Sequence, residues 1–311
     1  MHDLLVIGGG PAGLAAAAYG LGKQRDVRLV CADFDGKAGQ RQRLSGQSTR
    51  EHLVGEEAFI ALRETVAAHP SCIVEDQVIG LFKRDELFHV LTERTTLQAP
   101  AVIIATGAHP TGLGIPDEQQ LLGHGLGYSI TTHARLAAGR EVAVVGASER
   151  ALRGVAELVQ IAARIVLVAP APGALSSQLG QRLRADPRVH ILEGYSVVDV
   201  EASAGAVYAI RVTRQAMVQR LPVQAVFVDL GLVPNSHLVR QLVRLDQHGF
   251  ILVDDRNQTS LRGMFAAGDV TNRMCEQILI AIGEGARAAQ SAYDYTLVQR
   301  LGLDSRAIDA R

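Results

Sequence analysis

The sequence contains no tryptophan, and aromatic residues make up only 4% of its 311 residues. We therefore expect no broad platform of aromatic rings for stacking. The formal net charge is −1, so no basic field points to nucleic acid as a partner. No apolar run reaches the roughly 18 residues of a membrane span. Because glycines interrupt the first apolar run after residues 4–7, we also expect no signal peptide and no membrane partner.

Cysteine is equally scarce. The three cysteines, Cys31, Cys72 and Cys275, lie far apart and form neither a C-x-x-C pair nor a metal-binding spacing. This usage is typical of a reduced, cytoplasmic protein without a metal site.

A glycine motif near the start is the most informative feature that is present. Residues 4–7 predict a short buried strand, and Gly8, Gly10 and Gly13 follow with G-x-G-x-x-G spacing. An alanine-rich helix is predicted to begin at Pro11-Ala12. Gly10 would let the backbone approach a pyrophosphate, and the helix N-terminus would present its positive end to it. The motif therefore predicts a dinucleotide site.

The chain repeats this pattern further on. Residues 142–145 predict a strand, 146–148 a glycine turn, 149–163 a helix and 165–168 the next strand. Such an internal repeat and the chain length both favour two domains.

Other landmarks complete the pattern. Residues 102–105 predict a strand closed by Thr106-Gly107, and residues 189–228 predict short β-segments. Residues 261–269 predict a strand that ends in Gly268-Asp269, followed by a helix to about Leu297.

These landmarks resemble the low-molecular-weight thioredoxin reductases over nearly the whole chain. The matching stretches are GGGPAGLAAAAY (8–19), Gly39-Gln40, ATG (105–107), GIPDE (114–118), EVAVVG (141–146), GMFAAGDVTN (263–272), Gln277 and GEGARAA (283–289). The resemblance implies an α/β fold with two Rossmann-like dinucleotide-binding domains of the three-layer ββα type. An FAD-binding domain would comprise residues 1–111 and 241–311, and a degenerate NAD(P)H-binding-like domain would be inserted at 112–240. Homodimers are usual in this family.

The resemblance also implies the FAD-binding residues. They are Gly8, Gly10, Pro11, Ala12, Gly13, Asp33, Gly39, Gln40, Ala105, Thr106, Gly107, Gly268, Asp269, Gln277 and Ile278. Asp33 would hold the ribose hydroxyls, or it is a solvated loop acid. The helix after Gly268-Asp269 would direct its N-terminus at the flavin and stabilise negative charge there. The family usually has Arg before this Gln, whereas this chain has Glu276, which we expect to face solvent.

Two features of the family are missing. The redox cysteines of its C-A-T-C-D motif fall at Ser129 and Thr132, which cannot form a disulfide, so the usual dithiol relay is excluded. The second glycine motif has Ser148 where a pyrophosphate needs glycine. Residues 169–171 read Ala-Pro-Ala where the family has arginines that clamp the 2′-phosphate of NADPH. We expect NADPH binding to be lost unless Arg150, Arg153 or another cation substitutes.

Candidate catalytic groups are few. Cys275 lies near a helix N-terminus that could lower the pKa of its thiol, or it is a small packing residue. His133 is either a proton donor near the flavin or a structural histidine.

Three functions remain open from the sequence. The first is an FAD-dependent oxidoreductase that takes electrons from a ferredoxin-type or other protein donor, or from a small redox carrier. The family includes members that do not use pyridine nucleotides. The second is a ferredoxin–NADP reductase of the thioredoxin-reductase-like type, which would need the missing arginines. The third is a non-catalytic flavin-binding sensor.

Overall fold

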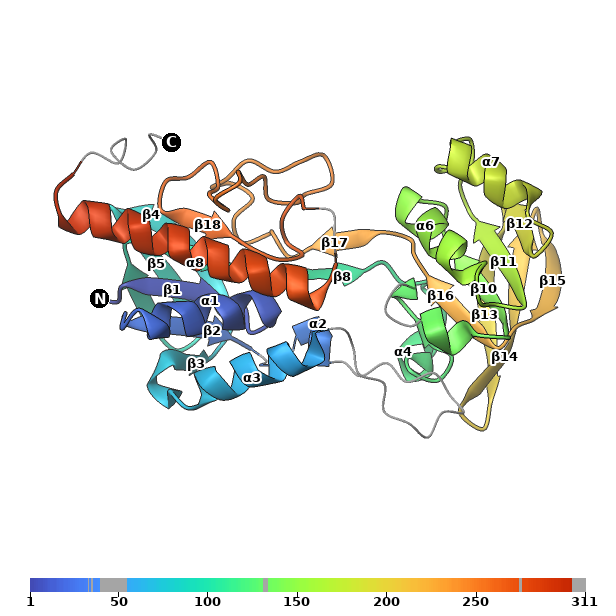
Figure 1. Cartoon of the computed structure of the whole chain (residues 1–311), viewed down its shortest axis with the longest axis horizontal. Coiled ribbons are helices and arrows are strands. Elements are labelled where there is room, and N and C mark those ends of the chain that lie inside the picture. Colours follow the sequence, from blue (N-terminus) through green and yellow to red (C-terminus); the bar gives the residue numbers. More distant parts are fainter. Residues whose placement is uncertain (33, 35, 40–54, 131–133, 274–275, 304–311) are drawn as a thin grey trace. The chain divides into compact units, whose positions relative to one another are not determined.

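The computed structural model describes residues 1–32, 34, 36–39, 55–130, 134–273 and 276–303, which form two compact units (Figure 1). The first unit contains residues 1–39, 55–109 and 233–303, and the second contains residues 110–232. The second unit thus ends at Leu232, whereas the sequence placed the end of the insertion at residue 240. The reason is burial, because Val239 and Val243 pack into the core of the first unit.

The first unit contains a parallel sheet, an antiparallel sheet and helices. Its elements are β1 (Leu4–Ile7), α1 (Pro11–Gly22), β2 (Val27–Cys31), α2 (Gly36–Gly39), α3 (Glu56–Ala67), a 3-10 turn (Pro70–Cys72), β3 (Ile73–Glu75), β4 (Val78–Arg84), β5 (Leu87–Thr92), β6 (Thr96–Ala99), β7 (Val102–Ile104), β18 (Met264–Ala266) and α8 (Ile278–Arg300). β8 (Ala108–Pro110) and β17 (Leu232–Pro234) pair with each other where the chain passes from one unit to the other.

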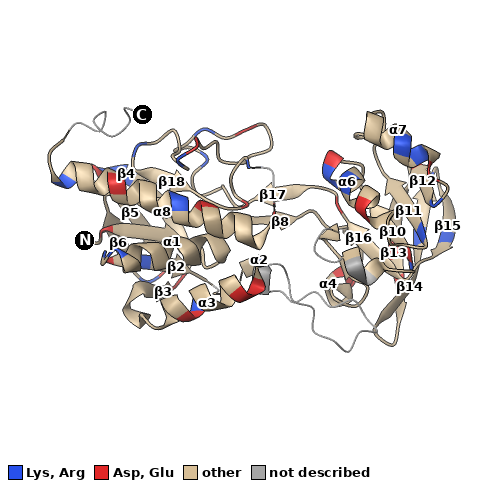
Figure 2. Ribbon diagram, in the orientation of Figure 1, with Lys and Arg blue, Asp and Glu red and all other residues tan. Residues whose placement is uncertain are grey.

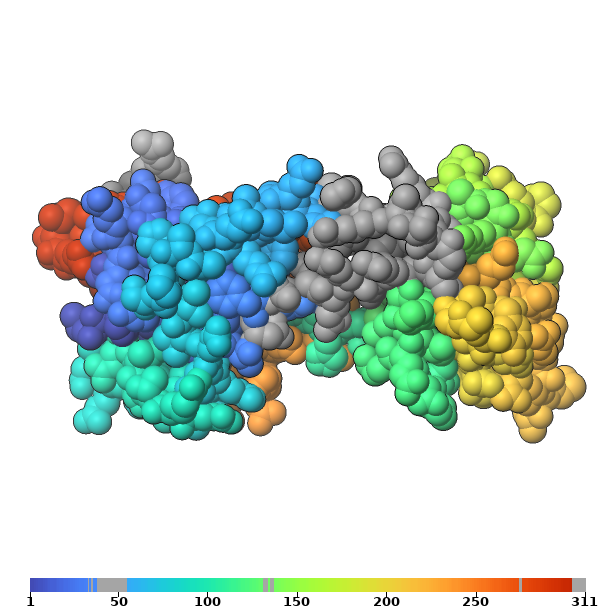
Figure 3. Space-filling view, turned by 90° about the horizontal axis from the view of Figure 1, so that it is seen from below, coloured from blue at the N-terminus to red at the C-terminus, as the bar shows by residue number. Residues whose placement is uncertain are grey.

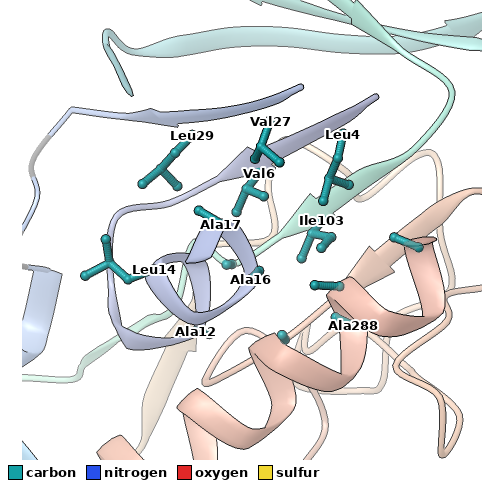
Figure 4. Packing of buried hydrophobic residues seen from close by; sticks show 14 of the residues in the cluster. Leu4, Val6, Ala12, Leu14, Ala16, Ala17, Val27, Leu29, Ile103 and Ala288 are labelled. Carbon is teal, nitrogen blue, oxygen red and sulfur yellow. The ribbon is translucent and has the colours of Figure 1, made fainter. Parts of the chain in front are cut away.

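The first unit has three layers, and side chains of β1 point alternately to the layers on either side of its sheet. The parallel sheet has the order β18-β7-β1-β2-β3. Leu4 and Val6 pack with residues of the helices on one face, as Figure 4 shows. Leu5 and Ile7 point to the other face, where they pack with residues of the antiparallel sheet β4-β5-β6. Successive side chains of a strand point to opposite faces, so a strand buried on both faces reads as a continuous apolar run.

Helices α1 and α8 lie side by side on this sheet (Figure 1). Their approach depends on Gly285, because a Cβ atom there would lie 2.0 Å from the carbonyl oxygen of Ala12. Helix α3 also packs on α1 through the buried Phe59 and Val66, and much of its remaining surface is exposed (light blue in Figure 3). Among the described helices, none is both long and apolar enough to cross a membrane.

The second unit repeats the three layers. Its elements are α4 (Glu118–Leu121), β9 (Leu126–Gly127), a 3-10 turn (Ala134–Ala137), β10 (Glu141–Val145), α6 (Glu149–Leu158), β11 (Arg164–Ala169), α7 (Gln178–Ala185), β12 (Val189–Glu193), β13 (Ser196–Ser203), β14 (Ala206–Arg214), β15 (Met217–Pro222) and β16 (Ala225–Val228). The parallel sheet has the order β12-β11-β10-β16-β9, and β13-β14-β15 form the antiparallel layer. Val144 packs with the helices and Val145 with the antiparallel sheet. Both units therefore confirm the predicted α/β, three-layer ββα fold.

The predicted elements agree with this fold and differ mainly at their ends. The helix predicted over 149–163 ends at Leu158, because the chain turns back there to meet the loop before β10. Gly139 donates its amide to Ile161 at 2.8 Å, and Ala163 donates to Arg140 at 2.9 Å. The last helix, predicted after Gly268-Asp269 and up to about Leu297, runs from Ile278 to Arg300.

Candidate functional site

The carboxyl ends of three parallel strands bring the predicted FAD residues of the first unit together. In the register of the sheet, Ile104 of β7 lies between Ile7 of β1 and Ala266 of β18. The segments that follow these strands, residues 8–13, 105–107 and 268–269, therefore lie at one edge of the sheet. Open α/β sheets bind ligands at this edge, outside the carboxyl ends of their strands.

The glycines of the first turn have different roles. Cβ atoms added at Gly8 and Gly13 would lie 2.2 Å from the oxygen of Ala105 and 1.8 Å from the oxygen of Gly8, so both glycines are required for packing. A Cβ atom at Gly10 would meet no described atom within 4 Å. The backbone at Gly10 therefore borders open space at the N-terminus of α1, which is the geometry that a pyrophosphate requires.

The segment 105–107 is held by a residue far away in the sequence. Thr106 donates its hydroxyl to the carbonyl of Asn235 at 2.7 Å, and the side-chain amide of Asn235 donates to the carbonyl of Thr106 at 2.8 Å. The backbone amide of Asn235 also donates to the carbonyl of Gly107 at 2.9 Å. Asn235 lies in none of the motifs that predict the cofactor site, so this clamp is a finding of the structure.

A buried carboxyl group fixes the turn at Gly268. Gly268 has a φ of +77°, which favours glycine, and its amide donates to Glu284 at 2.8 Å. Burial raises the pKa of the Glu284 carboxyl above its ordinary value, and the backbone bond from Gly268 opposes that rise. Glu284 thereby positions the neighbouring Asp269, whose side chain is 15% exposed.

Lys37 on α2 is the main residue of this site that sequence analysis missed. Its ammonium group lies 2.7 Å from Asp269 and also forms an ion pair with Glu276. Burial alone would lower the pKa of Lys37, but the two carboxylates outweigh it and raise the pKa. Glu276, which we expected to face solvent, is 25% exposed, and its carboxylate is bound by Lys37. The signal in the sequence was the position of Lys37 two residues before Gly39.

Helix α8 begins beside this cluster. Gln277 is its N-cap residue and Ile278 its first residue, as the sequence predicted. The carbonyl of Gln277 accepts a hydrogen bond from Ala281 at 2.9 Å. The first amides of the helix carry a partial positive charge that stabilises a nearby anion.

Of the remaining predicted residues, Gly39 is the last residue of α2. Asp33, Gln40, His133 and Cys275 lie outside the described residues. The predictions made for these four residues therefore stay predictions.

The second unit has the same strand–turn–helix geometry with different side chains. Ser148 is the N-cap of α6, and its hydroxyl accepts a hydrogen bond from the amide of Ala151 at 3.0 Å. Arg150 forms a two-point ion pair with Asp229, with Nε–Oδ2 and Nη2–Oδ1 distances of 2.8 Å. Helix α6 thus begins with charges of both signs (Figure 2).

Arg150 and Arg153, the two cations named as possible replacements for the missing arginines, both form ion pairs within the protein. Arg153 lies 3.2 Å from Glu149 at the surface of α6. Ala169 ends β11 and is buried, whereas Pro170 and Ala171 are exposed and uncharged. Among the described residues, no group of three or more His, Cys, Asp or Glu could hold a metal ion.

Comparisons with known proteins agree with this geometry. A family model described as "Pyridine nucleotide-disulphide oxidoreductase" matches residues 2–285. An alkyl hydroperoxide reductase component of Xanthomonas campestris pv. phaseoli is 32% identical over 305 residues, which cover 95% of this chain and 57% of that protein. An NADH dehydrogenase of Bacillus subtilis (strain 168) is 29% identical over 300 residues, which cover 95% of this chain and 58% of that protein. The chain thus spans less than two thirds of the length of these curated relatives.

Solved structures show the same fold. The thioredoxin reductase of Streptococcus pyogenes MGAS5005 superposes with a TM-score of 0.83 at 27% identity, covering 95% of this chain and 98% of that one. The thioredoxin reductase of Giardia duodenalis gives a TM-score of 0.84 at 22% identity, with 95% and 99% covered. The fold is therefore thioredoxin-reductase-like, as predicted.

Proposed function

The chain belongs to the pyridine nucleotide-disulphide oxidoreductase family, and from this premise we propose that it is an FAD-containing oxidoreductase without a redox dithiol of its own. The single observation that carries the proposal is the open backbone at the edge of the parallel sheet in the first unit, which we call the cradle. Gly10 borders open space there, at the N-terminus of α1, while the other glycines of the turn are closely packed. This arrangement fits the pyrophosphate of a dinucleotide.

The rest of the cradle fits the flavin half of FAD. Asp269 would hold the ribitol side, and Gln277 at the start of α8 would lie near the flavin ring. The bound flavin would supply the capacity to accept and pass on electrons. The α8 N-terminus would stabilise negative charge on it, and Lys37 would neutralise the carboxylates of Asp269 and Glu276 beside it.

We propose further that NADPH is not the electron source. Each bidentate bond of an arginine to a phosphate is a strong, charge-assisted interaction. Losing two such bonds to the 2′-phosphate, at roughly 1.5–3 kcal/mol each, weakens NADPH binding by about two to four orders of magnitude. Electrons would come from a ferredoxin-type protein or a small redox carrier. The homodimer expected from the resemblance remains part of the proposal.

The absence of the dithiol limits how electrons can leave the flavin. Ser129 stands at the first cysteine position of the related thioredoxin reductases, and Thr132 stands at the second. A hydroxyl group cannot exchange with a disulfide as a thiolate does. The proposed enzyme would therefore pass electrons from the flavin directly to its acceptor.

The proposed cofactor is tested by Gly10→Asp, with Gly22→Asp as the matched control at the other end of α1. A carboxylate at position 10 would meet the pyrophosphate at close range, so this variant should lose bound FAD after reconstitution and desalting. Both positions are open in the structure, so both variants should fold. The wild type and Gly22→Asp should stay yellow with about one FAD per chain. A colourless wild type after reconstitution would refute the proposal.

A further inference from the structure

The two units repeat the same backbone at their glycine turns. In the first unit, the amide of Ala105 donates to the last carbonyl of β1 at 2.8 Å, and in the second, the amide of Asp229 donates to the last carbonyl of β10 at 2.7 Å. A Cβ atom at Gly8 would lie 2.2 Å from the oxygen of Ala105, and one at Gly146 would lie 1.9 Å from the oxygen of Asp229. Asp229 therefore holds the position in the second unit that Ala105 holds in the first.

The side chains at matching positions differ in one consistent way. Two of these positions follow the first glycine of each turn by two and four residues, and the third is the position that Ala105 and Asp229 share. In the first unit all three residues are small: Gly10, Ala12 and Ala105. The second unit has polar or charged residues at the same three positions: Ser148, Arg150 and Asp229.

These three polar side chains bond to one another. Arg150 binds both carboxylate oxygens of Asp229 at 2.8 Å, and the Ser148 hydroxyl donates to Asp229 Oδ1 at 3.3 Å. The Asp229 side chain is only 6% exposed. A carboxylate that is buried and bonded in this way is held in one place.

Asp229 lies at the edge of the sheet where doubly wound folds bind their ligands. It follows β16, which lies beside β10 on the side opposite β11, so it stands at the point where the strand order reverses. Doubly wound sheets bind the pyrophosphate of a dinucleotide at this point, before the helix N-terminus. The Asp229 carboxylate lies at the N-terminal end of α6, where it is bonded to Ser148 and Arg150.

The structure assigns to Asp229 the role of an internal anion that occupies the phosphate-binding position of the second unit and so excludes nicotinamide nucleotides. Arg150 holds Asp229 in place, and its guanidinium is used in doing so. The inference rests on the proposed function, because it names the residue that prevents nucleotide use. Like charges placed together repel each other, so the carboxylate opposes phosphate binding in addition to the loss of the family's arginines.

The test is calorimetric titration of the FAD-loaded protein with NADPH and with NADH. Asp229→Asn keeps the shape of the side chain, and Asp229→Ala removes it. Both variants should bind at least about tenfold more tightly than the wild type, because the repulsion disappears and Arg150 is released toward the phosphate. The gain should vanish in Asp229→Asn combined with Arg150→Met. Asp186→Asn is the matched control, since Asp186 forms a similar pair with Arg188 away from the turn.

Two results would overturn the inference. Folded Asp229 variants whose affinity equals that of the wild type would show that the carboxylate excludes nothing. Micromolar binding by the wild type that is lost in Arg150→Met would show that the ion pair serves phosphate binding instead. The first result leaves the proposed function intact, whereas reduction of the wild-type flavin by NADPH would refute the proposed function itself.

Discussion

At the scale of single residues, the predicted FAD site of the first unit depends on where its charged side chains lie. The thioredoxin-reductase-like pattern has a cation just before Gln277, whereas here Glu276 occupies that position and Lys37 supplies the cation from a different segment. Lys37 binds Asp269 and Glu276 together. The sequence revealed the acidic substitution at position 276 but not its partner, because nothing local links residues so far apart in the chain.

Removing this cation should weaken FAD binding. Lys37→Met removes a positive charge beside two carboxylates and the proposed anionic cofactor, so its FAD dissociation constant should rise roughly tenfold or more, while Lys37→Arg should change it less. Quenching of FAD fluorescence measures this, with the exposed Lys23→Met as control. Equal affinity in Lys37→Met and Lys23→Met would show that Lys37 plays no part.

At the scale of elements, the close contact of α1 with α8 brings both ends of the chain to one site. The glycine motifs predicted the strands and helices on either side of them, because a buried strand, a glycine turn and an alanine-rich helix are local patterns. The clamp between Thr106 and Asn235 could not be predicted in this way. It depends on pairing between segments that only the complete fold brings together.

Two glycines of α8 test this contact against each other. In Gly285→Ala the new methyl group would meet the backbone of Ala12, so the free energy of unfolding should fall by roughly 1–3 kcal/mol. Gly283 has no described atom within 4 Å of its Cβ position. Gly283→Ala should therefore be neutral or raise that free energy by up to about 1 kcal/mol, through helix propensity alone. Urea denaturation followed by circular dichroism measures both, and equal stability of the two variants would contradict the packing argument.

At the scale of the whole molecule, one backbone pattern occurs twice with opposite chemistry. The first unit presents glycine and alanine around its turn, and the second presents an ion pair between Arg150 and Asp229. The sequence predicted the shared fold, because burial of apolar strand and helix faces requires it in both units. It also showed that the arginines for NADPH are missing. It did not indicate that a carboxylate occupies the phosphate-binding position of the second unit, because Asp229 follows a buried strand that carries no glycine motif.

The most direct test of the account is anaerobic mixing of the FAD-loaded protein with electron donors, followed by the absorbance of the oxidised flavin. We predict that NADPH and NADH leave this absorbance essentially unchanged, while reduced ferredoxin or a small reduced carrier bleaches it. Dithionite should bleach the flavin in every sample and so serves as the control for a reducible cofactor. Rapid, stoichiometric bleaching by NADPH would contradict the account.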